Sequence, residues 1–186
     1  MNFDESYFMG NTVKNPNPAG YGNYFDDPNL REPFQVLARN LISKLQILPH
    51  AKVLVVGCAF GFSVHYLYDL NIESYGMDIS KFAVDKATGD RKANVLIGDA
   101  RLEKDFEQFG VEKFDLIFDE DMICCLTDKE AKKFCEIANK YGSRVVHYLT
   151  AGNHLSKWYN NHTLQEWKEI IGGTDRWFER YTWNEE

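Results

Sequence analysis

Apolar residues along this chain follow two alternating patterns, one typical of amphipathic helices and the other of buried strands. Between residues 31 and 49 they recur at three- and four-residue spacing, which predicts a helix with one buried face. Residues 52–56 then form a short, nearly continuous apolar run that suits a parallel strand covered on both faces. The two patterns continue to alternate along the rest of the chain.

Further strands are predicted at 74–79, 94–97, 114–118 and 144–149, with a last one at 177–183. Helices are predicted at 61–70, 80–87, 101–109, 127–141 and 163–171. Ser80 stands in the cap position of one helix, and two others begin with capping boxes, Thr127 with Glu130 and Thr163 with Glu166. Strict alternation of this kind predicts an α/β fold, a doubly wound and mostly parallel sheet with helices on both faces.

The first 30 residues differ from the rest, because they are rich in Asn, Gly and Pro. Gly and Pro exclude a long helix there, yet the segment carries too many aromatic side chains for a disordered tail. We expect residues 1–30 to form an arm on an apolar surface, either a cover of the core or a lid over a site. Residues 31–186 are expected to form one domain. The aromatic residues of the arm include Tyr7, Phe8, Tyr21, Tyr24 and Phe25.

The charge balance disfavours nucleic acid as a partner, because the formal net charge is −7. No apolar run approaches the roughly 20 residues of a membrane-spanning helix, and the first residues show no secretory leader, which favours a cytoplasmic protein. The cysteines are expected to be free thiols, and they lack the spacing of a zinc site. Asp119, Glu120 and Asp121 cannot all converge on a metal ion, because alternate residues of a strand end point in opposite directions.

The residues that follow the predicted strands are the candidate site, because ligands of open α/β sheets bind at the carboxyl ends of the strands. The first strand runs into a turn from Gly57 to Gly61, where the backbone can approach a ligand closely. The dinucleotide pattern Gly-x-Gly-x-x-Gly is not met, because Ala59 and Phe62 stand in two of its glycine positions. The second strand ends near Asp78, whose carboxylate can accept hydrogen bonds from both hydroxyls of a ribose.

The third and fourth strands also end in acidic residues. Asp99 can accept a hydrogen bond from an adenine amino group while neighbouring backbone contacts the ring. Asp119, Glu120 and Asp121 form a run of carboxylates, which indicates solvent exposure or a cationic or proton-donating ligand. Taken singly, Asp99 is equally an ordinary turn residue.

Together and in this order, the four strand ends resemble the class I methyltransferases that use S-adenosylmethionine. The turn at 57–61 resembles the glycine motif of that family, 75–80 its ribose-acid motif, 98–100 its adenine-edge motif and 114–122 its fourth-strand motif. The resemblance implies a Rossmann-like methyltransferase fold and methyl transfer from S-adenosylmethionine to a small-molecule or peptidic acceptor. It also implies a truncated sheet, because the family usually ends with two strands and one fits after residue 172.

The resemblance further implies which residues hold the cofactor, without assigning a catalytic residue. Tyr7 and Tyr24 of the arm are expected, from their aromatic character and not from the resemblance, to close over the cofactor, since an aromatic face attracts a sulfonium. The remaining residues are Gly57, Cys58, Ala59 and Gly61 at the methionine half, Asp78 at the ribose, Ile79, Asp99 and Ala100 at the adenine, and Asp119 and Glu120 at the amino-acid and sulfonium region.

Three positions depart from the pattern of the family. Val55 replaces a frequent acid, Ala59 replaces the middle glycine, and Cys125 stands where many relatives carry histidine. These departures keep a second hypothesis open, in which the chain binds adenosylmethionine without catalysis or serves as a scaffold. The arm and the loop at 151–159, with His154, are expected to border the acceptor.

Overall fold

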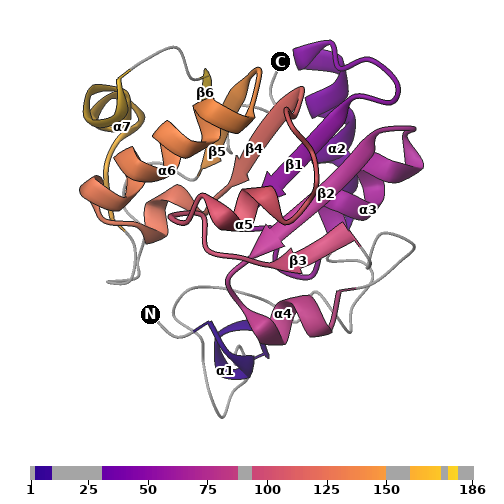
Figure 1. Ribbon diagram of the computed structural model, residues 1–186, viewed down its shortest axis with the longest axis horizontal. Coiled ribbons are helices and arrows are strands. Elements are labelled where there is room, and N and C mark those ends of the chain that lie inside the picture. The colour runs from indigo at the N-terminus through magenta and orange to yellow at the C-terminus, as the bar shows by residue number, and fades with distance from the viewer. Residues whose placement is uncertain (1–2, 10–30, 88–93, 150–159, 173–175, 180–186) are drawn as a thin grey trace.

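A six-stranded parallel sheet forms the centre of the computed structural model, which describes residues 3–9, 31–87, 94–149, 160–172 and 176–179. The strand order is β3-β2-β1-β4-β5-β6, and each neighbouring pair runs in parallel (Figure 1). The doubly wound α/β fold is confirmed. The strands are β1 (Lys52–Val56), β2 (Glu73–Asp78), β3 (Val95–Ile97), β4 (Leu116–Glu120), β5 (Val145–Leu149) and β6 (Arg176–Glu179).

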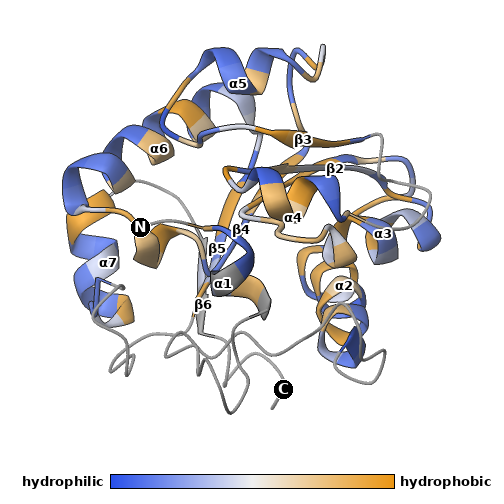
Figure 2. Ribbon diagram, turned by 90° about the horizontal axis from the view of Figure 1, so that it is seen from below, coloured by the Kyte–Doolittle hydropathy of each residue, from blue (hydrophilic) through white to orange (hydrophobic). Residues whose placement is uncertain are grey.

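Helices cover both faces of the sheet, as Figure 2 shows. On one side lie α2 (Glu32–Leu45) and α3 (Phe62–Asp69), and on the other lie α5 (Lys104–Glu107), α6 (Asp128–Tyr141) and α7 (Leu164–Ile171). A 3-10 turn, η3 (Ile123–Cys125), follows β4. Two short helices, α1 (Glu5–Met9) and α4 (Lys81–Asp85), pack on each other near the ends of β1 and β2 (Figure 1).

The alternation of side chains along β1 explains why the core has two layers. Leu54 and Val56 pack into the layer beneath α5, α6 and α7, whereas Val53 and Val55 pack into the layer beneath α2 and α3. All four side chains are buried, and each such burial contributes roughly 1.5–3 kcal/mol. Val55, at the position where the family often has an acid, is therefore a core residue here.

The predicted helix starts are confirmed by their caps. The Ser80 side chain accepts a hydrogen bond from the amide of Ala83 at the start of α4. Both capping boxes are present, at the starts of α6 and α7. Among the described helices, none combines the length and the apolar character that crossing a membrane requires.

One helix boundary differs from the prediction because a local turn intervenes. The helix expected at 101–109 is reduced to α5, because a turn closed by the Leu102 amide on the Asp99 carbonyl precedes it. The last strand, β6, begins at Arg176 and pairs in parallel with β5, and the rest of the strand expected at 177–183 lies outside the described residues. No antiparallel strand occurs among the described residues.

Candidate functional site

The sheet reverses its winding between β1 and β4, because the chain builds outward through β2 and β3 and then returns to the other side of β1. Open α/β sheets bind ligands at such a reversal. The register sets Val56 beside both Met77 and Asp119, and sets Asp78 beside Ile97. The turns that carry the four sequence motifs therefore lie along one edge of the sheet.

The turn after β1 is held in a conformation that glycine favours. Gly57 and Gly61 have φ values of 75° and 74°. A Cβ atom on Gly57 would lie 2.5 Å from the Cβ of Met122, so no larger residue fits against the β4 turn. Ala59 also adopts a left-handed φ of 48°, which costs an L-residue roughly 1–2 kcal/mol. The turn thus has no side chain at position 57 and carries a methyl group at position 59.

Asp78 ties this turn to the end of β2. Its Oδ2 accepts a hydrogen bond from the Ala59 amide and its Oδ1 accepts one from the Ser80 amide, each at 2.8 Å. Burial raises the pKa of this carboxyl group, and the two amide hydrogen bonds oppose the shift. Each carboxylate oxygen has about two acceptor positions, so each keeps one that no described residue fills. Two open acceptors on one carboxylate suit a diol such as a ribose.

Next to Asp78, the structure leaves an apolar side chain exposed. Ile79 is 46% exposed although isoleucine is usually buried, and it follows directly on the carboxylate. Across the sheet edge, the amide of Gly98 donates to the Asp78 carbonyl at 3.0 Å, which sets the β3 turn beside it. Ile79 therefore offers an exposed apolar surface next to Asp78, the residue expected to bind a ribose.

The β3 turn leaves one amide open. The amides of its neighbours all donate within the protein, whereas that of Ala100 has no partner among the described residues. The amides that donate are those of Gly98, Asp99, Arg101 and Leu102.

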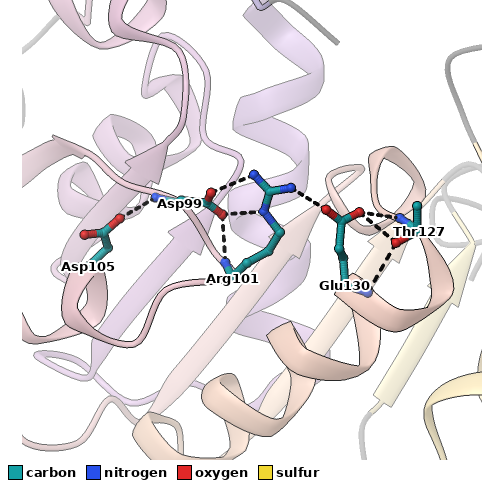
Figure 3. A network of polar contacts seen from close by, with 5 residues as sticks. All are labelled: Asp99, Arg101, Asp105, Thr127 and Glu130. Carbon is teal, nitrogen blue, oxygen red and sulfur yellow. Dashed lines mark hydrogen bonds and ion pairs between the residues drawn. The ribbon is translucent and has the colours of Figure 1, made fainter.

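Asp99 is bound by an arginine that the sequence analysis did not single out (Figure 3). Arg101 donates from Nε to Asp99 Oδ1 at 2.8 Å and from Nη2 to Oδ2 at 2.7 Å, and its amide also donates to Oδ1 at 2.9 Å. These hydrogen bonds hold the pKa of the Asp99 carboxyl group below its usual range. Asp99 is thus a fixed, ionised acceptor.

Asp119 lies in a different place from the one that the resemblance implies. Its side chain is 0% exposed, and its Oδ2 lies 2.9 Å from Nδ1 of His147 on β5. Its Oδ1 accepts hydrogen bonds from the amides of Met122 and Ile123. Burial raises its pKa, and His147 opposes the shift. The carboxylate faces the protein interior and organises the β4 turn, so we leave it out of the proposed site.

The network around Asp119 extends deeper into the core. Cys135 Sγ lies 3.7 Å from His147 Nε2, and the Trp177 ring stacks on the imidazole with centroids 4.1 Å apart. A histidine inside the apolar run of β5 was a signal available in the sequence, because a buried polar side chain requires a partner.

Glu120, unlike Asp119, lies at the edge of the sheet beside the glycine turn. Its Oε2 accepts a hydrogen bond from Ser63 Oγ at 2.6 Å, which links the end of β4 to the first turn of α3. Cys58, in contrast, turns inward: a Cβ on Gly76 would lie 2.7 Å from its Sγ. Burial raises the pKa of this thiol, with further contributions from Asp78 and Glu120. The Cys58 thiol is therefore a core group, and the Cys58 amide and carbonyl are hydrogen-bonded to the Met77 carbonyl and the Gly61 amide.

The arm reaches the site through its first helix. Phe8 of α1 is 2% exposed and its ring lies 5.2 Å from that of Phe60 in the glycine turn. The same apolar cluster contains the methyl group of Ala59, and Ser80 Oγ donates to the Phe3 carbonyl. Tyr24 and His154 lie outside the described residues.

Comparison with known proteins places the chain in a family. Residues 47–186 match the family model of a methyltransferase domain. The chain belongs to this methyltransferase family. No curated protein matches it.

Solved methyltransferases share the fold. Magnesium protoporphyrin IX methyltransferase from Synechocystis PCC 6803 with bound SAH has a TM-score of 0.59 at 19% identity, covering 78% of this chain and 72% of that chain. The same enzyme with bound SAM gives 0.58 at 20% identity, covering 82% and 73%. A TehB-like SAM-dependent methyltransferase from Corynebacterium glutamicum ATCC 13032 Kitasato gives 0.54 at 18% identity, covering 78% and 82%. The cofactor of this methyltransferase family is S-adenosylmethionine, as the motifs predicted.

Proposed function

We propose that this methyltransferase binds S-adenosylmethionine along the ends of β1, β2 and β3 and transfers its methyl group to a small-molecule or peptidic acceptor. One observation carries the proposal: the hydrogen-bonding positions that the site leaves open complement adenosine. Asp78 keeps two acceptors for the two ribose hydroxyls. The Ala100 amide can donate to the adenine ring, and Asp99 can accept from its amino group.

The residues at the turn after β1 would hold the methionine half. Gly57 and Gly61 bring bare backbone to the edge of the sheet, next to Glu120. The carboxylate of Glu120 supplies negative charge beside the turn, where the ammonium and sulfonium groups of the cofactor would lie. Ile79 would pack against the adenine ring.

When bound, the sulfonium supplies an electrophilic methyl group. The contribution of the protein is to hold donor and acceptor in line, and such positioning supplies roughly 7–11 kcal/mol of a reaction barrier. A base is required only if the acceptor must lose a proton.

Calorimetry tests the binding step. The wild-type protein should bind S-adenosylmethionine and S-adenosylhomocysteine, and Asp78→Ala should weaken both by about 100-fold, or about 2.7 kcal/mol, because both ribose acceptors are lost. Circular dichroism establishes that the variant is folded. Absence of binding to wild-type protein at millimolar ligand, or undiminished binding to the variant, would refute the proposed site.

A second function, cofactor binding without turnover, is favoured by the conformation of Ala59. Its left-handed backbone and its methyl group, packed with Phe8, alter the turn at the position where the family has glycine. The two functions are separated by incubating the protein with S-adenosylmethionine and a panel of acceptors. Release of S-adenosylhomocysteine with a methylated product supports the enzyme, whereas tight binding with no product from any acceptor supports the binding protein.

A further inference from the structure

Arg101 holds the carboxylate of Asp99 from two directions. The guanidinium donates to both oxygens, and the amide of the same residue donates to Oδ1 (Figure 3). The planar fork of arginine matches a carboxylate in this geometry, which a lysine cannot reproduce. The Asp99 side chain is 20% exposed and that of Arg101 is 34% exposed, so solvent reaches the pair on one side.

The contacts of the pair leave few acceptor positions open. An ionised carboxylate has about four lone-pair positions and no donor. Arg101 fills two positions on Oδ1 and one on Oδ2, so one position, on Oδ2, is open among the described contacts. Beside it, the Ala100 amide is a donor without a described partner. The β3 turn thus presents one acceptor next to one donor.

A second anchor fixes Arg101 itself. Its Nη1 bonds to Glu130, whose other oxygen accepts from the amide and the hydroxyl of Thr127 at the start of α6. The amide of Asp99 in turn donates to Asp105 at 2.8 Å. The chain of contacts in Figure 3 therefore joins the β3 turn to the start of α6, the helix that follows β4. Neither Asp99 nor Arg101 can rotate without breaking several charged hydrogen bonds.

We propose that Arg101 is a positioning residue that makes this site selective for a 6-amino purine over a 6-oxo purine. The inference rests on the proposed function, because it assumes that the purine edge meets Asp99 and Ala100. In adenine, N1 is an acceptor and the 6-amino group is a donor, which complements the open donor and acceptor. In hypoxanthine both are reversed: N1 carries a hydrogen and O6 is an acceptor. A carboxylate held in place cannot turn away from O6 or take up a proton to match it.

The test compares S-adenosylhomocysteine with its 6-oxo analogue, S-inosylhomocysteine, by calorimetry. The ratio of their dissociation constants is the readout, because a general loss of structure would lower the affinity for both ligands by the same factor. Wild-type protein should prefer the amino ligand by about 100-fold, since a site built for one hydrogen-bond pattern rejects its reverse. Arg101→Met removes both guanidinium contacts and leaves the Asp99 side chain held only by the amide of residue 101, so the carboxyl group can turn or protonate more easily, and this preference should fall by about tenfold or more. The preference of Arg101→Lys should lie between those of the wild type and Arg101→Met.

Lys104→Met is the matched control, because it removes the same charge from an exposed side chain that takes no part in the contacts of Figure 3. Its preference should equal that of the wild type. The inference is overturned if Arg101→Met and Arg101→Lys keep the wild-type ratio of dissociation constants. This includes the case in which the affinities for both ligands fall by the same factor. If wild-type protein binds neither ligand, the proposed function itself fails, which is a different result.

Discussion

Asp78 and Asp119 stand at equivalent places in the chain but have different surroundings. Asp78 is the last residue of β2 and Asp119 the last but one of β4, each accepts hydrogen bonds from amides of a turn, and burial raises the pKa of each. The Oδ2 atom of Asp119 is hydrogen-bonded to Nδ1 of His147, and no part of the Asp119 side chain is exposed. Asp78 accepts one amide on each oxygen and keeps 8% exposure at the edge of the sheet.

The difference shows that a strand-end acid becomes a ligand group or a structural group according to its neighbours on other strands. β5 places the imidazole of His147 beside Asp119, whereas β3 places the apolar Ile97 beside Asp78. A carboxylate that retains open acceptors can bind a ligand, and one whose acceptors are filled stabilises the turn instead.

The largest effect is expected from Asp119→Ala. It leaves His147 and two amides without their acceptor in a fully buried site, so the free energy of unfolding should fall by roughly 3–5 kcal/mol. Urea denaturation measures the loss. A loss below about 1 kcal/mol would contradict the structural role of this carboxylate.

Replacing each acid by asparagine should affect ligand affinity at Asp78 and stability at Asp119. Asp78→Asn keeps one oxygen but loses a ribose acceptor, so affinity for S-adenosylhomocysteine should fall about tenfold, or about 1.4 kcal/mol. Asp119→Asn should lower the free energy of unfolding while changing affinity by less than about threefold. Calorimetry and urea denaturation of both variants give the four values. Equal losses of affinity would mean that Asp119 also faces the ligand.

A methyl group added at Gly57 should destabilise the protein more than one added at Gly110. Gly57 and Gly110 both have positive φ, but a Cβ on Gly57 would strike Met122, whereas nothing lies within 4 Å of a Cβ on Gly110. Gly57→Ala should therefore destabilise the protein by about 1 kcal/mol more than Gly110→Ala, since both share the backbone strain. Thermal unfolding of the two variants measures the difference, and equal losses would disprove the close contact.

A smaller effect on binding is expected from the arm. Phe8→Ala removes a ring that packs on Phe60 and Ala59, so the turn should be held less firmly and cofactor affinity should fall about threefold. Phe109→Ala, in the core layer of α5 and away from this cluster, is the control. Unchanged affinity would show that the described part of the arm covers the core and does not act as a lid.

The smallest effects are opposite pH dependences of stability. The folded-state pKa of Asp78 is raised above 3.8, so the native state binds the proton more tightly and stability from this group falls as pH rises through that window. The folded-state pKa of Asp99 is lowered, so its stabilisation is present above pH 3.8 and is lost as pH falls toward the folded-state value. Urea denaturation of wild type, Asp78→Asn and Asp99→Asn from about pH 3 to about pH 7 should give difference slopes of opposite sign. Slopes of one sign would show that the two acids do not differ in this way.

The sequence by itself determined the fold and the place of the site. Apolar periodicity, capping boxes and glycine positions are local properties, so strands, helices and turns could be found without knowing what packs against them. Only the tertiary structure decided which acids remain available to a ligand. His147 on β5 and Arg101 beyond β3 meet Asp119 and Asp99 through strand register and turn geometry, and a hydrogen bond depends on tenths of an ångström that no local pattern records.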